Sequence, residues 1–113
     1  MKYMLLIYSP QTADAAPDPE THQEYGRFTQ EILDSGEMLG GDALQAVDTA
    51  TSVRVRDGKR STTDGPFAET KEVLGGYYYV DVKDLDRAIE LAGKIPGARH
   101  GTIEVRPVLE LGG

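Results

Sequence analysis

The feature that most constrains the fold is a pair of segments that are apolar on both faces. Lys2 to Tyr8 is a continuous apolar run without alternation, which is typical of a strand buried on both sides. Gly76 to Val82 has few polar side chains, and its three consecutive tyrosines must point alternately to the two faces of a strand. Both faces of the sheet that contains these strands therefore have to be covered.

Two helices are predicted, and each has suitable capping residues. Asp18 and Pro19 fit the N-cap and first position of one helix, which Gly36 ends. A second helix begins after Asp84 and ends at Pro96. The apolar stripes at helical spacing are Tyr25, Phe28, Ile32 and Leu33 in the first helix, and Leu85, Ala88, Ile89, Ala92 and Ile95 in the second.

Further extended segments fill the space between and after the helices. Met38 to Leu44 is a weak, glycine-containing strand, and Gly101 to Leu109 is the closing strand. Thr51 to Arg56 alternates with its valines on one face, and Asp57-Gly58 turns it into a returning strand, Lys59 to Thr63. Asp-Gly between two extended runs is a strong hairpin signal. We expect a loop or irregular element from Asp64 to Leu74.

The order of strand, helix, several strands, helix and strand predicts an α+β, ferredoxin-like fold with two helices on one face of an antiparallel sheet. A chain of 113 residues has the size of one domain, so we expect a single domain over 1–113. Two helices cover only one face of that sheet. We expect a second copy of the same sheet to cover the other in a homodimer, and the alternative is a monomer with an aromatic-lined cleft.

Composition argues against several classes of partner and cofactor. With 19 acidic and 12 basic residues the net charge is −7, which disfavours nucleic-acid binding. The densest basic group is expected to be the solvated face of the hairpin and consists of Arg54, Arg56, Lys59 and Arg60. The chain has no cysteine, and its two histidines, His22 and His100, are far apart in sequence. We therefore expect neither a metal site nor another cofactor.

No segment predicts a membrane partner. The longest apolar stretch, Tyr3 to Tyr8, is too short to span a bilayer. The N-terminus lacks the basic start and the cleavage site of a signal peptide. We expect a cytoplasmic protein.

One segment concentrates ionisable side chains around a Gly-Pro turn, and its sequence is Asp64-Gly65-Pro66-Phe67-Ala68-Glu69-Thr70-Lys71-Glu72. The DGPF tetrapeptide with this extension resembles the signature of the DGPF branch of the YCII-related proteins. The similarity continues through the segments Met1 to Tyr8, Thr51 to Gly58 and Glu104 to Pro107.

That resemblance implies a ferredoxin-like subunit that forms dimers of the dimeric α/β-barrel type, with a cleft in each subunit. It does not imply a known reaction. Members of the family occur beside, or fused to, extracytoplasmic-function sigma factors, and relatives with the barrel architecture include muconolactone isomerases and small monooxygenases. The resemblance also implies a His–Asp pair whose histidine lies in the first helix, where this chain has His22.

Asp64 and His22 are the candidate catalytic residues. Burial near Phe67 would raise the pKa of the Asp64 carboxyl and make it a general base, whereas Asp before Gly most often caps a turn. His22 lies at the edge of the apolar helical stripe, where a partly buried, hydrogen-bonded histidine is the common outcome and catalysis the alternative.

Arg106 is the candidate anion anchor. It alternates with Ile103 and Val105, which places it on the face away from the helices, and its partner is either Glu104 or the carboxylate of a ligand. The other candidate substrate-binding residues, which otherwise form a solvated cluster or pack in the sheet, are Tyr8, Phe67, Glu69, Lys71, Tyr77 and Tyr79.

Two functions fit these residues. One is a small-molecule-binding dimer, which as an acid–base enzyme would act on a small polar or anionic organic substrate. The other is a non-catalytic regulatory or ligand-sensing dimer associated with an extracytoplasmic-function sigma factor. Both predict the same cleft, with Asp64 and Arg106 on its rim or floor, and a carboxylate with a strongly raised pKa would favour the enzyme.

Overall fold

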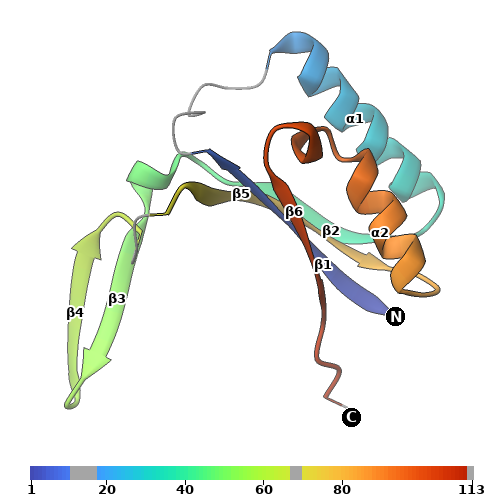
Figure 1. The fold of residues 1–113 in the computed structure, drawn as a ribbon. Helices are drawn as coiled ribbons and strands as arrows, with labels where there is room; N and C mark the ends of the chain where they lie inside the picture. Colours follow the sequence, from blue (N-terminus) through green and yellow to red (C-terminus); the bar gives the residue numbers. More distant parts are fainter. Residues whose placement is uncertain (11–17, 67–69, 112–113) are drawn as a thin grey trace.

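A computed structural model of the protein describes residues 1–10, 18–66 and 70–111 (Figure 1). Its elements, in chain order, are β1 (Lys2–Pro10), α1 (Pro19–Asp34), β2 (Met38–Ala43), β3 (Thr51–Arg56), β4 (Lys59–Asp64), β5 (Glu72–Asp81), α2 (Leu85–Lys94) and β6 (Thr102–Pro107). Short 3-10 turns occupy Val47–Thr49 and Pro96–Arg99.

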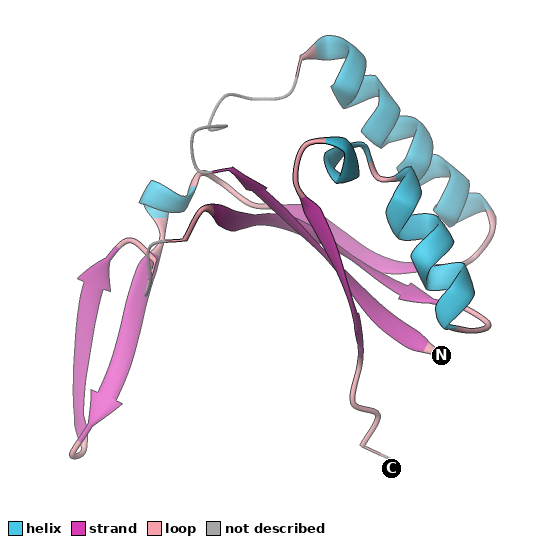
Figure 2. Ribbon diagram, viewed as in Figure 1, coloured by secondary structure: helices cyan, strands magenta, loops and turns pink. Residues whose placement is uncertain are grey.

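Four strands form one antiparallel sheet in the order β2-β5-β1-β6, and both helices lie on the same side of it (Figure 2). This is the predicted α+β arrangement of ferredoxin-like type. The two strands that are apolar on both faces, β1 and β5, are the central ones. Each is paired along both edges, and the helices cover only one of their two faces, so the apolar side chains on the other face are not covered by the helices.

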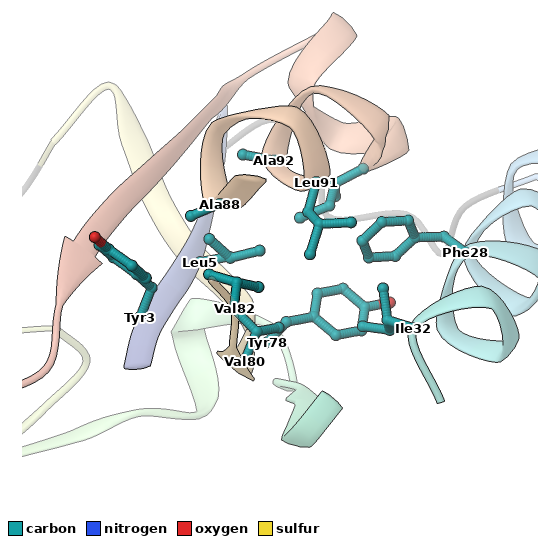
Figure 3. Close-up of a cluster of buried hydrophobic side chains, with 11 residues drawn as sticks. Tyr3, Leu5, Phe28, Ile32, Tyr78, Val80, Val82, Ala88, Leu91 and Ala92 are labelled. Carbon is teal, nitrogen blue, oxygen red and sulfur yellow. The ribbon is translucent and has the colours of Figure 1, made fainter. Parts of the chain in front are cut away.

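The core lies between the sheet and the helices (Figure 3). Phe28 of α1 meets Tyr78 of β5 edge to face, with ring centroids 5.1 Å apart. The Tyr78 hydroxyl stays satisfied because it is 2.8 Å from Oγ1 of Thr29. The buried apolar residues are Tyr3, Leu5, Phe28, Ile32, Tyr78, Val80, Val82, Ala88, Leu91, Ala92 and Ile95.

The predicted helix ends are confirmed, but part of each predicted apolar stripe is wrong. Asp18 and Asp84 are the N-caps, and each accepts a hydrogen bond from a backbone N–H of the first turn. Leu33, Leu85 and Ile89 are 52%, 46% and 53% exposed. In α2 the buried face instead includes Leu91, together with Ala88 and Ala92. Spacing alone shows which apolar residues are neighbours on a helix, but the docking angle on the sheet decides which of them are buried.

Strand β5 begins earlier than predicted. The register between β1 and β5 shifts between Ile7 and Tyr8, and beyond this irregularity Tyr8, Ser9 and Pro10 still pair with β5. Residues 72–74 therefore belong to the strand rather than to the predicted loop that ends at Leu74. A bulge of this kind needs a partner strand, so a single segment of sequence does not reveal it.

The predicted hairpin is confirmed as a separate two-stranded sheet of β3 and β4. Asp57 and Gly58 both have positive φ, 53° and 74°. A tight turn with two such residues matches the twist of the flanking strands, which is why Asp-Gly is favoured there. The hairpin projects from the end of the main sheet at which β5 begins, toward the side away from the helices (Figure 1).

Candidate functional site

The face of the main sheet away from the helices has an apolar centre. Tyr3 and Leu5 of β1 point into the core, so Met4 and Leu6 lie on the opposite face. Across the ladder, Met4 pairs with Tyr79 and Leu6 pairs with Tyr77. These four side chains are only partly buried. We call this side of the sheet the open face. Besides the four residues of its centre it carries Tyr8, Asp42, Glu104 and Arg106.

A tyrosine–carboxylate pair borders this centre on the β2 side. The Tyr77 hydroxyl donates a 3.0 Å hydrogen bond to Oδ2 of Asp42, which faces it across the β2–β5 ladder. That hydrogen bond, together with the carboxylate charge, raises the pKa of Tyr77, because both favour the neutral phenol. The neutral phenol form of Tyr77, which can act as a hydrogen-bond donor, is therefore further favoured.

An ion pair borders the centre on the β6 side. Glu104 pairs with Leu6, and Arg106 pairs with Met4, so both side chains are on the open face as predicted. Arg106 Nε donates to Oε2 of Glu104 over 2.7 Å, and Nη2 donates to the same oxygen. A guanidinium has five N–H donors. Glu104 uses two of them, and the others can bind a second anion.

Tyr8 extends the open face toward the hairpin end of the sheet. It pairs with Leu74 on one side and with Thr102 on the other. The Thr102 hydroxyl donates a 2.9 Å hydrogen bond to Oε1 of Glu72, which bridges the ends of β5 and β6. The predicted residues that share the open face are thus Tyr8, Tyr77, Tyr79 and Arg106.

Other predicted site residues lie elsewhere. Asp64 is exposed at the end of β4, where it pairs with Thr51 in the hairpin sheet, so within one subunit it is not in the sheet that carries Arg106. Its location next to Gly65, which has a φ of 93°, fits a turn. Lys71 is exposed, and Phe67 and Glu69 lie outside the described residues.

His22 is exposed on α1, which corrects the expectation of a partly buried, hydrogen-bonded side chain. The helices cover the face opposite to the open face, so His22 and Arg106 are on different sides of the sheet (Figure 2). His100 is exposed just before β6.

Sequence reasoning missed Asp42. It lies in the weak glycine-containing strand, and nothing local distinguishes it from other acidic residues. Its partner is identified only by the pairing of β2 with β5, which contains a register shift between Met38 and Gly40. The pair of Asp42 and Tyr77 is therefore created by the pairing of β2 with β5 and not by any local sequence pattern.

A separate hollow of about 620 Å³ lies at the start of α2. Its lining residues are Ser35, Glu37, Asp81, Lys83, Asp84, Asp86, Arg87 and Glu90. Arg87 links the beginning of β2 to α2, because its Nε and Nη2 donate to Glu37 over 2.9 and 2.8 Å and its Nη1 contacts Glu90. None of the predicted site residues within the described part of the chain lines this hollow, and we interpret the cluster as structural.

The ion pair of Glu37 with Arg87 makes the stability of the fold depend on pH. The hydrogen bonds from Arg87 lower the pKa of Glu37 from 4.5 to about 2. Because the pKa of Glu37 is lower in the folded protein than in the unfolded chain, the ionised Glu37 stabilises the fold at pH values above 4.5. This contribution to the free energy of unfolding is lost as the pH falls from 4.5 toward 2. We expect Glu37→Gln to lower the free energy of unfolding by about 1–2 kcal/mol at neutral pH. Its urea denaturation midpoint should change less than that of the wild type between these acidic values.

The matched control is Glu31→Gln. Glu31 pairs with Lys94 at 2.8 Å, but both side chains are nearly half exposed. Such pairs contribute between zero and about 1 kcal/mol. Equal destabilisation by the two substitutions would contradict a special role for the Glu37–Arg87 pair.

Two further observations concern cofactors and membranes. Within residues 1–10, 18–66 and 70–111, no group of three or more histidine, cysteine, aspartate or glutamate side chains is arranged to hold a metal ion. In the same part of the chain, neither helix is long and apolar enough to cross a membrane.

Comparison with known proteins identifies a family. The YCII-related domain matches residues 1–112. A protein of Rhizobium meliloti (strain 1021), described as uncharacterised, is 30% identical over 114 aligned residues, which cover 96% of this chain and 92% of the relative.

Proposed function

This chain belongs to the YCII-related family, and we propose that it works as a homodimer whose two open faces pack together and hold a small polar organic ligand. The observation that supports this most directly is the open face itself. Met4, Leu6 and the rings of Tyr77 and Tyr79 form an apolar centre that no helix covers. Polar groups able to bind a ligand lie at its borders.

The surface area of the isolated subunit supports a second copy. The chain exposes 7988 Å², whereas a compact monomer of 12.3 kDa is expected to expose about 6,100 Å². The excess, to which the exposed β3–β4 hairpin contributes, is larger than the roughly 800 Å² that each partner buries in an interface of standard size. A twofold arrangement would bury the same apolar centre on both copies.

The borders of the open face favour a ligand with an anionic group and a planar apolar part. Arg106 can bind a carboxylate with the donors that Glu104 does not use. The Tyr77 hydroxyl can donate a hydrogen bond to a ligand in exchange for the one it now donates to Asp42. Tyr79, opposite Met4 between these two borders, offers an aromatic surface.

The positions of His22 and Asp64 favour ligand binding over acid–base catalysis by this pair. His22 is exposed on the helical side and Asp64 belongs to the hairpin. We therefore propose a ligand-sensing dimer first, with the sigma-factor association that the family resemblance implies. An acid–base enzyme is the alternative, in which Tyr77 would donate a hydrogen bond to the substrate. Chemical change of a bound compound would favour the enzyme.

Ligand binding can be tested with a defined panel of probes. We expect at least one of benzoate, salicylate, maleate and succinate to raise the melting temperature of the dimer, and both Arg106→Gln and Tyr77→Phe to reduce that shift. Arg27→Gln is the control, because Arg27 is an exposed arginine on α1. If all three variants respond like the wild type, the binding site is not on the open face.

The tyrosine–carboxylate pair permits a separate test. Asp42→Asn removes both the charge and the strongest acceptor of the Tyr77 proton, so the pKa of Tyr77 should fall toward the ordinary value of 10. NMR of tyrosine labelled at the ring carbon that bears the hydroxyl would measure this. An unchanged Tyr77 titration in Asp42→Asn would show that the two side chains do not interact in solution.

A further inference from the structure

The two strands of the β3–β4 hairpin bury almost no side chain in the subunit that carries them. Every residue of both strands except Ser52 is exposed. At its base, the Ser52 hydroxyl donates to the Gly65 carbonyl over 2.7 Å, and Gly65 N–H donates to Ala50 over 2.6 Å. An isolated two-stranded hairpin is at best marginally stable in water. An arm of this kind requires a further surface to pack on.

One side of the hairpin is suited to protein contact. The register places Val53 opposite Thr62 and Val55 opposite Arg60 on the same side. The two valines are 57% and 59% exposed. Exposed apolar side chains on a projecting strand favour association with another protein surface.

The geometry directs the arm toward the space in front of the open face. It projects away from the helices, on the side of the sheet that the proposed dimer would cover (Figure 1). A second copy packed on the open face would lie within reach of the arm.

The charge distribution along the chain also favours a second copy of this chain as the partner of the hairpin. Residues 51–63 contain four basic residues and one acidic residue, so this segment has a net charge of +3. The whole chain has 12 basic and 19 acidic residues, which leaves 8 and 18 outside this segment and a net charge of −10 there. A basic arm and a strongly acidic body attract each other between copies.

We infer that the β3–β4 hairpin is a dimerisation arm that packs its valine side, which also carries Arg60, on a second copy of this chain, and that the net positive charge of the arm attracts it to the acidic body of that copy. The inference rests on the homodimer of the proposed function but concerns a different surface. A nucleic acid is the competing partner for a basic hairpin, and the charge of −10 on the rest of the chain disfavours it.

Sedimentation equilibrium of the full-length chain tests the arm. We expect Val53→Thr/Val55→Thr to raise the dimer dissociation constant about tenfold or more, since threonine keeps the branched shape suited to a strand. Arg56→Glu/Lys59→Glu should have a similar effect that diminishes at high salt. The controls are Ile89→Thr, at a site 53% exposed on α2, and Arg27→Glu/Lys83→Glu, which makes the same charge change on exposed residues elsewhere.

The outcomes separate the arm from the open face. If Leu6→Lys dissociates the dimer while both arm variants match their controls, the arm inference is overturned and the open-face dimer stands. If the arm variants weaken the dimer and Leu6→Lys does not, the arm inference stands and the open-face dimer is overturned. A monomeric wild type at high micromolar concentration would overturn both. An unchanged dimer whose binding of a short DNA duplex is abolished by Arg56→Glu/Lys59→Glu would assign the arm to nucleic acid instead.

Discussion

Leu6→Lys is expected to convert the dimer into a monomer at micromolar concentration. Leu6 lies at the centre of the open face, between Tyr77 of β5 and Glu104 of β6. In a twofold interface each copy would bury one lysine beside Glu104, which already pairs with Arg106, and burying a charge without a dedicated partner costs several kcal/mol. We expect the dissociation constant to rise at least about 100-fold, which corresponds to about 2.7 kcal/mol. Light scattering and sedimentation equilibrium would measure it.

The same substitution should leave the subunit folded. Leu6 points away from the core, whose β1 residues are Tyr3 and Leu5. The circular dichroism spectrum should therefore be unchanged. Ile89→Lys, on the outer surface of α2, introduces the same charge at a position that is 53% exposed and should leave the dimer intact. Retention of the dimer by Leu6→Lys would show that the open face is not the interface.

Gly101→Ala is expected to destabilise the subunit by about 3 kcal/mol, the upper end of the usual cost of overpacking. A Cβ on Gly101 would overlap the backbone carbonyl oxygen of Tyr8 and lie 3.1 Å from Cα of Ser9. Backbone cannot rotate away as a side chain can, so the junction between β1 and β6 has to shift. For a domain of this size, a loss of 3 kcal/mol lowers the melting temperature by roughly 12–24 °C.

The control makes the same substitution where space is available. Gly26 lies within α1, and no heavy atom is within 4 Å of the position its Cβ would occupy. Gly26→Ala should stabilise the protein by about 0.5–1 kcal/mol, because alanine loses less backbone entropy in a helix. Calorimetry should therefore show a lower melting temperature for Gly101→Ala and a higher one for Gly26→Ala than for the wild type. A neutral Gly101→Ala would contradict it.

Several features could be predicted because they depend on neighbours in sequence. Asp18 and Asp84 cap helices through backbone N–H groups a few residues away. The turn at Asp57-Gly58 depends on the φ angles of those two residues. Arg106 could be assigned to the open face because strand alternation has a period of two, whatever the exact ends of the strand.

Other features depended on contacts between distant segments. Ile89 and Leu91 are both apolar, but only Leu91 is buried, since the docking of α2 on the sheet selects the face. The sequence also did not show that Asp64 ends a hairpin that forms its own sheet, separate from the sheet that carries Arg106. The order of residues along the chain does not state whether a hairpin joins the main sheet or leaves it.

The sequence by itself determined the types of element, their caps and the presence of two strands that are apolar on both faces, since each follows from backbone geometry and side-chain polarity over a few residues. Only the tertiary structure decided that Asp42 meets Tyr77, that His22 lies on the opposite side of the sheet from Arg106, and that the hairpin stands apart. The physical reason is that strand order, bulges and helix docking are set by the collective packing of the whole chain, and no single segment encodes them.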